Sequence, residues 1–559
     1  MRYVSLMVLI IFFCCSGQNE KSLEKENRVR GMVVSAHPEA SAVGYAILEQ
    51  GGNAYDAAVA VQFALAVVYP RAGNVAGGGF AVFRLNSGET GTLDFREKAP
   101  IQAHRNMYLD QDSSVIKGLS SFGSLSVGVP GTVDGMFQLH KKYGVLPFDM
   151  AIQPAIDLAA QGFALTKKEA DKLNQYQDEF LRANNFDFPF LNSSGWTEGD
   201  SIRLPMLAKT LERIKDHGRG GFYAGETAKN IIDAMHDVGI ITPEDLSNYQ
   251  SVWREPIIGS YKDFKVVAMS PPSSGGIALM QLLKGSQSFD FEKMGHNTAE
   301  SIHVMAELER RVYADRATYL GDPDFNPVPT DMLLDSAYIA NRNARISLEK
   351  TTPSDQIREG KVDVIESVET THFSIVDKQN NAIAITTTLN GNFGSKVFVE
   401  KGGFFLNNEM DDFSVKLGVP NQYGLVGAEM NSIQSGKRML SSMTPTILEK
   451  NGELYMVLGT PGGSTIITSV YQTILNVVEH GMTLQQAIDS KKVHHQWQPD
   501  AITYERGAID SAARNELVRM GHELREVQFI GRVDAVLMNN NGSLEGGADP
   551  RGDDAAVGF

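Results

Sequence analysis

The sequence predicts a layered fold of the α/β or α+β class, in which helices cover β-sheets. A strand-like run at 32–36 is followed by two helical patterns, at 38–50 and 54–68. The pattern changes in the last third, where 371–376 and 382–388 have the alternation and the intervening turn of a β-hairpin. Because strands flanked by helices occur in both halves, sheets covered by helices are the expected arrangement.

The first two helices have recognisable start and stop signals. The helix expected over 38–50 is followed by Gly51-Gly52, a favourable C-terminal stop. Asn53 is suited to cap the next helix, which should end before Pro70. Since 54–68 is apolar nearly all round, this second helix should be deeply buried.

Two more strands are expected at 80–85 and 90–95, followed by a largely helical region from about 130 to 349. Within that region, 204–214 and 299–319 have a 3.6-residue apolar period. The remaining expected elements are a rigid turn at 271–276, an exposed connector at 350–369, strands at 403–406, 444–448 and 455–459, and helices at 464–480 and 484–490.

Composition narrows the functional class. The 559 residues are 42% hydrophobic and 21% charged, enough for one large layered unit or two domains. A net charge of −16 disfavours nucleic-acid binding, so a small molecule or peptide is the expected substrate. The only cysteines are Cys14 and Cys15, which excludes disulfides, catalytic thiols and cysteine-ligated metals from the rest of the chain.

The first 15 residues are expected to be a secretory signal. Arg2 precedes a mostly apolar run, 3–13, that is too short to anchor in a bilayer. Cys14 or Cys15 could accept a lipid, although a small residue usually precedes such a cysteine; a lipid anchor and plain cleavage both remain open. Residues 16–30 are polar and charged and predict a flexible tether. The protein is therefore expected to be exported to the periplasm, either free or membrane-anchored as a lipoprotein.

Several standard catalytic motifs are absent from the sequence. There is no GxxxxGK[ST], GxSxG or HExxH pattern. His494 and His495 are adjacent, the wrong spacing for joint metal ligation from one helix face, so a structural role is expected. The glycine run 77–79 is not a dinucleotide fingerprint and is expected to allow close backbone packing.

Thr370 stands at the start of the expected hairpin, directly after the connector. A threonine hydroxyl is a weak nucleophile unless a base is adjacent. If the Glu369–Thr370 bond is cut, the freed α-amine, with an ordinary pKa of about 8, can take the proton of the hydroxyl on the same residue. The hydroxyl can make that cut itself by attacking the preceding carbonyl to give an ester that water opens. Taken alone, a Thr-Thr pair before a strand is more simply explained by β-propensity.

Four other polar stretches strengthen the catalytic interpretation. Arg96 could bind a carboxylate in a bidentate fork, and the acids of 407–413 could hold an ammonium group. The run 440–445 offers two hydroxyls, and 459–464 offers bare backbone N–H groups for an oxyanion hole. Each has a simpler alternative: a surface ion pair, a capping loop, an ordinary turn and a strand-to-helix turn. Together they suit acyl transfer from a substrate with an α-carboxylate and an α-ammonium group.

From about Gly31 to Phe559 the sequence also resembles the gamma-glutamyltransferases, or gamma-glutamyltranspeptidases. The motifs that carry the resemblance are EQGGNAYDAAVA (49–60), LDFRE (93–97), ADRATYLGDPDF (314–325), TTHFSIVD (370–377), NNEMDDF (407–413), LSSMTPT (440–446) and GTPGGS (459–464).

The resemblance implies an αββα sandwich of the N-terminal-nucleophile hydrolase type. It also implies autocleavage into a large subunit, 31–369, and a small catalytic subunit, 370–559, which form a heterodimer. Thr370 would be the nucleophile, and Thr388 would hydrogen-bond its hydroxyl. The other roles implied are α-carboxylate binding by Arg96, Ser441 and Ser442, α-ammonium binding by Asn390, Glu409 and Asp412, an oxyanion hole at Gly462 and Gly463, and a lid loop, 418–427, that covers the pocket with Tyr423.

The reaction implied is cleavage of the gamma-glutamyl amide of glutathione or related compounds through a Thr370 ester. Water, an amino acid or a peptide would then accept the glutamyl group, and no metal or organic cofactor is needed. Two alternatives remain. One is a glutaryl or cephalosporin acylase-like amidase on the same fold, and the other is a non-catalytic exported lipoprotein that binds glutamyl peptides.

Overall fold

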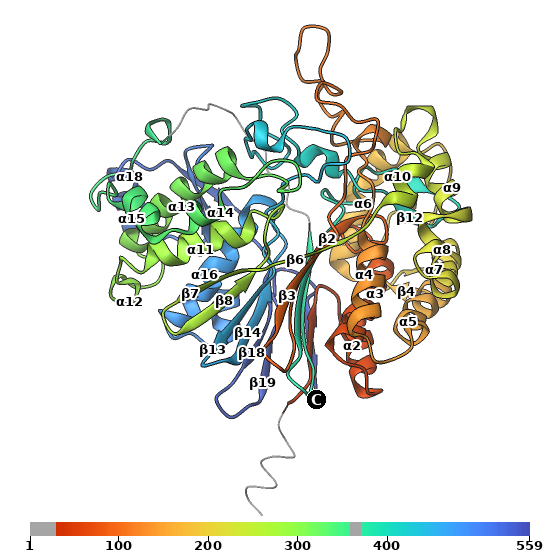
Figure 1. The fold of residues 1–559 in the computed structure, drawn as a ribbon, viewed down its shortest axis with the longest axis horizontal. Helices are drawn as coiled ribbons and strands as arrows, with labels where there is room; N and C mark the ends of the chain where they lie inside the picture. The colour runs from red at the N-terminus through yellow and green to blue at the C-terminus, as the bar shows by residue number, and fades with distance from the viewer. Residues whose placement is uncertain (1–28, 358–369) are drawn as a thin grey trace, which may run out of the picture.

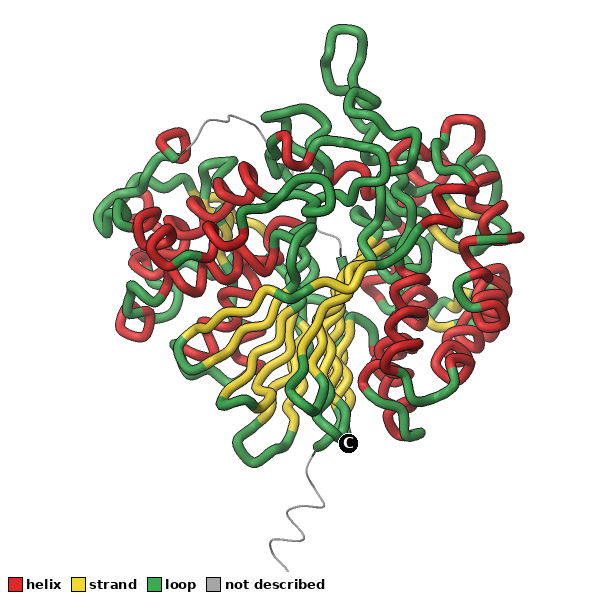
Figure 2. The backbone as a smooth tube through the Cα atoms, in the orientation of Figure 1, coloured by secondary structure: helices red, strands yellow, loops and turns green. Residues whose placement is uncertain are grey.

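The computed structural model describes residues 29–357 and 370–559. Two stacked antiparallel β-sheets form its centre, and helices cover the outer face of each sheet (Figures 1 and 2). This arrangement is the four-layer αββα sandwich that the resemblance implied, so the predicted fold class is confirmed. The signal sequence, most of the tether and Glu369 lie outside the described residues.

The first sheet contains seven strands, and the second contains six. In order across the first sheet they are β20 (Ala555–Gly558), β1 (Met32–Ser35), β9 (Thr371–Val376), β10 (Ala382–Thr388), β2 (Gly78–Arg84), β3 (Thr90–Asp94) and β6 (Val252–Arg254). In order across the second they are β19 (Leu544–Gly547), β18 (Asp534–Met538), β14 (Glu453–Gly459), β13 (Thr446–Lys450), β8 (Phe264–Ala268) and β7 (Ile257–Tyr261).

The helical layers differ in origin. The layer over the first sheet and its extensions comprise α2 (Pro38–Glu49), α3 (Ala54–Val68), α4 (Thr132–Tyr143), α5 (Phe148–Gln161), α6 (Lys167–Ala183), α7 (Pro205–His217), α8 (Gly220–Tyr223), α9 (Gly225–Ala234) and α10 (Pro243–Asn248). The helices beside the second sheet are α11 (Gly275–Ser286), α12 (Phe291–Met294), α13 (Ala299–Tyr319), α14 (Thr330–Leu334), α15 (Ser336–Asn343), α16 (Ile466–Val478), α17 (Leu484–Asp489) and α18 (Ser511–Arg519). Short strands at the periphery are β4 (Phe163–Ala164), β5 (Ser201–Ile202), β11 (Phe398–Val399), β12 (Phe404–Phe405), β15 (Val493–His494), β16 (Ile502–Glu505) and β17 (Leu524–Val527).

Strand alternation divides the core into layers. On β1, Val33 packs against the helices beside the first sheet, whereas Val34 faces the second sheet. On β9, Phe373 and Ile375 join the helix-side cluster, and Val376 joins the cluster between the sheets. Because both faces of these strands are covered, both strands of the hairpin are buried throughout even though their sequence alternates.

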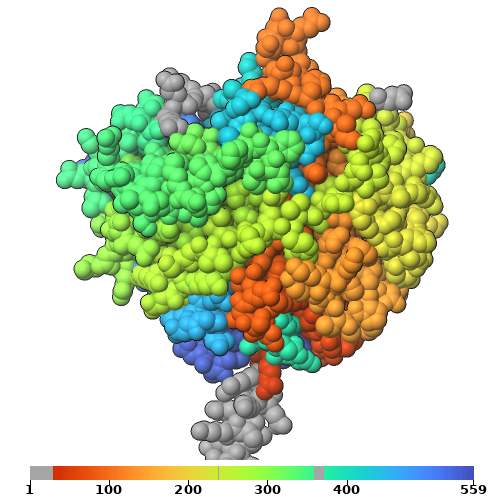
Figure 3. All heavy atoms as spheres, in the orientation of Figure 1, coloured from red at the N-terminus to blue at the C-terminus, as the bar shows by residue number. Residues whose placement is uncertain are grey.

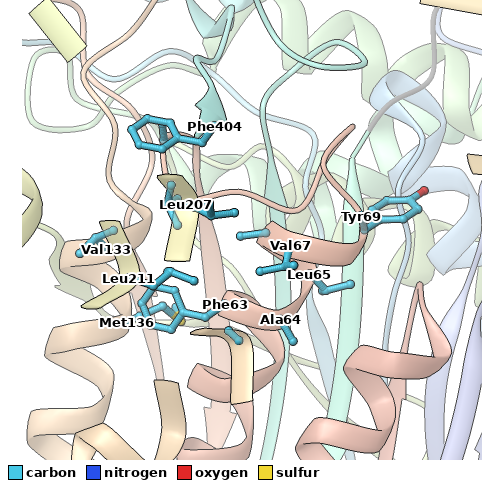
Figure 4. Packing of buried hydrophobic residues seen from close by; sticks show 14 of the residues in the cluster. Phe63, Ala64, Leu65, Val67, Tyr69, Val133, Met136, Leu207, Leu211 and Phe404 are labelled. Atoms are coloured by element: carbon cyan, nitrogen blue, oxygen red, sulfur yellow. The ribbon is translucent and has the colours of Figure 1, made fainter. Parts of the chain in front are cut away.

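Helix α3 lies within the helical layer and is buried along its whole length. Asn53 caps it as predicted, since its side chain accepts from the N–H groups of Tyr55 and Asp56, and the Asp56 carboxylate accepts from the Asn53 N–H. Figure 4 shows the apolar side chains of this helix packed among those of its neighbours. The helix therefore forms the centre of the largest apolar cluster and fixes the sheet that carries Thr370.

Two expectations for the middle of the chain hold only in part. The region expected to be largely helical also contains β7 and β8, which form an edge hairpin of the second sheet. Part of the segment expected to be an exposed connector is hydrogen-bonded to the body of the protein. Within its described residues, the hydroxyl groups of Thr351 and Thr352 donate to the carboxylate of buried Glu307. Its remainder, 358–369, lies outside the described residues.

A smaller apolar cluster joins two long loops at one end of the sandwich. Tyr108, from the loop between β3 and α4, packs with Met410, Phe413 and Met439. Figure 3 shows the first loop, in orange, projecting from the top of the molecule beside the cyan surface of the later segment. This packing holds together the loops that carry Arg96 and the acidic residues after 408.

The first sheet combines strands from both sides of residue 369. β1 lies between β20 and β9, and it pairs with both in antiparallel register. β10 lies between β9 and β2, pairing Thr388 with Gly78 at one end and Ala382 with Arg84 at the other. The predicted large and small subunits are thus two parts of one sheet and not two separate domains.

Within the described part of the chain, no helix combines the length and apolarity needed to cross a bilayer.

Candidate active site

Thr370 immediately precedes β9, one of the central strands of the first sheet. Its side chain is almost fully buried, with 5% relative exposure, but it reaches a pocket. Thr388 ends the neighbouring strand β10, whose register pairs Thr387 with Thr371. The hydroxyl oxygen of Thr388 accepts a 2.8 Å bond from the Asn390 N–H. The hairpin therefore places both threonines at the same end of the sheet, at the pocket.

The pocket, here called the Arg96 pocket, is lined by residues from seven separated segments of the chain. Its free volume is ≈ 30 Å³. Ten of the eleven residues predicted from the resemblance line it, and they are Thr370, Thr388, Arg96, Asn390, Glu409, Asp412, Ser441, Ser442, Tyr423 and Gly463. Gly462 is not among the lining residues. Their gathering in one pocket is consistent with a shared site, while the individual roles stay predictions.

Arg96 is fully buried and bonded to several acceptors. One guanidinium nitrogen donates to Glu409, and another donates to Asp412 at 2.5 Å. Longer contacts reach the backbone oxygens of Met439 and Leu440, at 3.3 and 3.4 Å. This arrangement orients the guanidinium, and it also means that a substrate carboxylate must compete with protein acceptors for its N–H groups.

Carboxyl groups outnumber the arginine around it. Burial raises the pKa of Glu409 well above its ordinary value, although Arg96 opposes this shift. Burial also raises the pKa of Asp412, and it holds the pKa of Glu97 at about 7. For Arg96, burial lowers the pKa, but the nearby carboxylates outweigh it and the net shift is upward. The excess of acidic groups makes the pocket receptive to an additional cation, such as a substrate ammonium group.

Arg316 is a pocket residue that the sequence argument missed. It lies on α13, is 5% exposed, and donates from Nε to the Ser274 hydroxyl at 2.9 Å and from Nη2 to the Ser442 hydroxyl at 3.0 Å. No carboxylate among the described residues forms an ion pair with it. The available signal was its position in the ADRATYLGDPDF motif, a charged residue on a helix that is buried nearly all round.

The segment predicted to be a lid is attached to the pocket at several points. The Tyr423 hydroxyl donates to the Asn390 backbone oxygen at 2.5 Å. Asn421 donates from its side chain to Asp412 at 3.1 Å, and the Gln422 N–H donates to Asp411 at 2.9 Å. Asn390 itself adopts a left-handed conformation with φ 72° and donates to the Asn408 oxygen at 3.0 Å. The loop and the acidic segment thus form one bonded unit.

The glycine pair before α16 has a conformation that other residues rarely adopt. Gly462 has φ 146° and Gly463 has φ 53°. A Cβ on Gly463 would lie 2.5 Å from the Tyr423 ring. The turn therefore brings bare backbone and the lid tyrosine together at the pocket.

The adjacent histidines lie in the core, as expected of structural residues. His494 and His495 are both buried, and burial lowers the pKa of each to about 4. His494 shares hydrogen bonds with Thr468 at 2.9 Å and Gln496 at 2.8 Å. Among the described residues, no cluster of three or more acidic, histidine or cysteine side chains is arranged to hold a metal ion.

Comparisons with known proteins agree with this geometry. The "Glutathione hydrolase proenzyme" of Escherichia coli (strain K12) is 42% identical over 534 residues, covering 95% of this chain and 92% of the relative. The crystal structure of gamma-glutamyltranspeptidase from Helicobacter pylori has 46% identity and a TM-score of 0.57, covering 60% of this chain and 97% of that chain. Cephalosporin acylase from Bacillus halodurans has 25% identity and a TM-score of 0.80, covering 95% and 96% of the two chains.

A family model described as gamma-glutamyltranspeptidase matches residues 40–559. That match includes every strand of the two sheets except β1, all of the pocket residues and Thr370 itself. The family expected from the sequence motifs is confirmed, and the chain belongs to the gamma-glutamyltranspeptidase family.

Proposed function

We propose that this protein is a glutathione hydrolase of the autoprocessed type, which cleaves gamma-glutamyl amides through an ester on Thr370. The observation that carries the proposal is the placement of Thr370 in one pocket with Arg96, Glu409 and Asp412. A gamma-glutamyl group has an α-carboxylate and an α-ammonium at one end and the scissile amide at the other. Arg96 complements the carboxylate, and the surrounding acids complement the ammonium.

The chemistry begins with maturation of the precursor. The Thr370 hydroxyl attacks the carbonyl of Glu369, and the acyl group moves from the nitrogen to the oxygen, which frees the α-amine of Thr370. Water then hydrolyses the ester, which releases the Glu369 carboxylate and restores the Thr370 hydroxyl. That amine then takes the hydroxyl proton when the oxygen attacks a substrate carbonyl. We assign to the Thr388 hydroxyl, at the end of the paired strand, the role of holding the Thr370 oxygen in position.

Turnover follows in two half-reactions. Attack on the gamma-carbonyl forms a tetrahedral oxyanion, which the backbone N–H groups of the Gly462–Gly463 turn are suited to stabilise. Its collapse passes a proton to the leaving nitrogen and expels the amine, which is cysteinylglycine when the donor is glutathione. Water, an amino acid or a peptide then attacks the ester, and the Thr370 hydroxyl is regenerated. No step in this scheme needs a metal or an organic cofactor.

Precursor cleavage is tested by intact mass and N-terminal sequencing of the purified protein. The proposal expects two co-purifying chains, one of which begins at Thr370. A single intact polypeptide that still hydrolyses glutathione would refute the proposed mechanism. The same outcome separates an enzyme from a non-catalytic glutamyl-peptide-binding protein, because binding alone requires no cut.

Substrate choice is tested against the acylase alternative, which the likeness to cephalosporin acylase makes worth measuring. Gamma-glutamyl-p-nitroanilide and glutaryl-p-nitroanilide differ only in the α-ammonium group. The acidic environment of Arg96 predicts a preference for the glutamyl compound of at least about ten-fold. Equal rates, or a preference for the glutaryl compound, would favour an amidase that does not use an ammonium clamp.

We further propose that the mature protein works outside the cytoplasm, in the periplasm or attached to its membrane. The apolar N-terminal run and Cys14-Cys15 support export. Mass spectrometry of the mature N-terminus distinguishes plain signal cleavage from a lipid-modified cysteine.

A further inference from the structure

Arg316 lines the Arg96 pocket and is not used by any step of the proposed reaction. It is buried near the end of α13, and its Nε and Nη2 atoms donate to the hydroxyls of Ser274 and Ser442. Its hydrogen-bond partners among the described residues are therefore uncharged. Burying a guanidinium without a bound carboxylate is costly, and an anion bound in the pocket would offset that cost.

The two arginines of the pocket differ in their surroundings. Arg96 is bonded to the carboxylates of Glu409 and Asp412, which balance its charge. Burial lowers the pKa of Arg316, and nearby Asp412 opposes this effect only in part. The positive charge of Arg316 is thus less compensated by the protein, and it is more available to the anionic group of a ligand.

The bond from Arg316 limits where the proton of the Ser442 hydroxyl can point. Arginine has only donors, so the Ser442 oxygen must be the acceptor in their 3.0 Å bond. This is the only hydrogen bond of that hydroxyl among the described residues, so its own proton has no acceptor there. Because Ser442 lines the pocket, the proton is available to an acceptor on the ligand.

A second chain of hydrogen bonds connects Arg316 to Ser441. The Ser274 hydroxyl, which accepts from Arg316 Nε at 2.9 Å, donates to the Ser441 backbone oxygen at 2.6 Å. The Ser274 N–H donates to the same oxygen at 2.7 Å, and the Ser441 N–H donates to the Pro272 oxygen at 3.0 Å. The predicted rigid turn at 271–276 is thus bonded directly to the segment that carries both pocket serines.

Arginine is suited to this double contact. Its planar guanidinium holds Nε and Nη2 at a fixed separation, so the two hydroxyls that it binds are held at a fixed separation as well. Ser274 is fully buried and does not line the pocket, whereas Ser442 does. Arg316 therefore ties a pocket serine to a fixed point of the fold, across the predicted boundary between the large and small subunits.

We infer that Arg316 is a positioning residue for recognition of the donor's α-carboxylate. It holds Ser441 and Ser442 so that their hydroxyls can donate to that carboxylate, and its charge favours the anion. This inference rests on the proposed gamma-glutamyl chemistry. Arg96 would bind the carboxylate directly, and Arg316 would act through the serines.

The test uses three p-nitroanilide donors with the same leaving group. The gamma-glutamyl donor has both charged groups, the gamma-aminobutyryl donor lacks only the α-carboxylate, and the glutaryl donor lacks only the α-ammonium. The kcat/KM of the gamma-glutamyl donor divided by that of the gamma-aminobutyryl donor is here called the carboxylate ratio. The same quantity divided by the kcat/KM of the glutaryl donor is the ammonium ratio. Each ratio compares one preparation with itself, so the fraction of matured enzyme cancels.

Arg316→Met should lower the carboxylate ratio about ten-fold, the value of one charge-assisted hydrogen bond. Arg316→Lys should lower it by a smaller factor, because lysine keeps the charge but lacks the planar fork that holds both hydroxyls. Neither variant should lower the ammonium ratio, since neither removes an acceptor for the ammonium group.

Action through the serines is tested with two further variants. Ser274→Ala removes a hydroxyl that does not line the pocket, and it should still lower the carboxylate ratio. In a double-mutant cycle with Ser442→Ala, Arg316→Lys should lower the ratio less than it does alone, because one hydroxyl through which it acts is already absent. Fully additive effects would contradict the positioning role.

Arg311→Lys is the matched control. It makes the same substitution on the same helix at a similarly buried arginine, but Arg311 is paired with Glu307 and does not line the pocket. Both of its ratios should stay at the wild-type values. An equal loss of kcat/KM for all three donors in Arg316→Lys, and in Arg316→Met where it folds, would indicate a purely structural role and overturn the inference. Failure of the wild type to cleave gamma-glutamyl-p-nitroanilide would instead overturn the proposed function itself.

Discussion

The Arg96 guanidinium bonds the Glu409 carboxylate, which comes from a residue 313 positions later in the chain. In the predicted mature protein these two residues would belong to different subunits. Glu409 is also linked to the buried carboxyl group of Glu97 by a side-chain hydrogen bond. The contact therefore orients the arginine within a group of buried carboxyls, which would attract a substrate ammonium group.

Arg96→Ala should raise the KM for gamma-glutamyl-p-nitroanilide by about 100-fold, since a bidentate carboxylate contact is worth roughly 2–3 kcal/mol. Autocleavage, followed on denaturing gels, should be affected much less because it needs no free carboxylate. Arg105→Ala is the control, as this exposed arginine is paired with Glu429 and lies outside the pocket. Equal loss of maturation and turnover in Arg96→Ala would assign Arg96 a structural role.

Thr370→Ala should abolish both precursor cleavage and hydrolysis. The mutant should run as one chain on a denaturing gel, because the hydroxyl that attacks the Glu369 carbonyl has been removed. The melting temperature of Thr370→Ala should remain near that of a precursor that matures slowly and is still uncut, since the lost side chain is small. Thr371→Ala, next along the strand, keeps the nucleophile and should still mature. A fully active Thr370→Ala enzyme would contradict the mechanism.

Gly463→Ala should lower kcat at least about ten-fold, as expected for a disturbed oxyanion site. The added methyl would lie 2.5 Å from the Tyr423 ring, and φ 53° is unfavourable for alanine. The double variant Gly463→Ala/Tyr423→Ala separates these two causes. Recovery of kcat in the double variant would indicate a clash with the lid, whereas continued loss would indicate backbone strain in the turn.

Glu97→Gln should reduce the pH dependence of stability. Burial holds the pKa of Glu97 at about 7, above its ordinary 4.5, so the folded state binds the proton more tightly than the unfolded state. This contribution is complete below pH 4.5 and is lost as the pH rises through about 7. Its size is on the order of 3 kcal/mol.

Melting temperatures of the wild type and Glu97→Gln, taken at about pH 5 and about pH 8, measure this effect. Between the lower and the higher pH, the Glu97→Gln variant should lose less stability than the wild type does. Some dependence should remain, because burial also raises the pKa values of Glu409 and Asp412. Exposed Glu49→Gln serves as the control, and an identical pH dependence in Glu97→Gln and the wild type would disprove the prediction.

Sequence patterns predicted the helices and strands whose ends, burial or alternation can be recognised from neighbouring residues. Helix α3 was predictable because Asn53, Pro70 and an unbroken apolar stretch mark its ends and its burial. The β9–β10 hairpin was predicted at its observed residues, since alternation and a polar turn coincide there. The edge strands β7 and β8 were missed because they are short and lie within a helical region.

The site could not be assembled from local patterns. Arg96, Thr370, Glu409 and Ser441 come from distant segments. Their residue types together suggested acyl transfer, but only the family resemblance implied a role for each of them. Arg316 escaped notice because a buried arginine on an extensively buried helix has no distinctive spacing.

The strand order β20–β1–β9–β10–β2 affects how the protein can refold after it has been cleaved. Strand β1 is hydrogen-bonded on both edges to strands that follow residue 369, so cutting the backbone there breaks one covalent link and none of the ladder bonds. Once separated, neither fragment would be expected to refold alone, because each contains only some of the strands of the shared sheet. Assembly must therefore precede scission, and a denatured mature enzyme should refold far less readily than its uncut precursor.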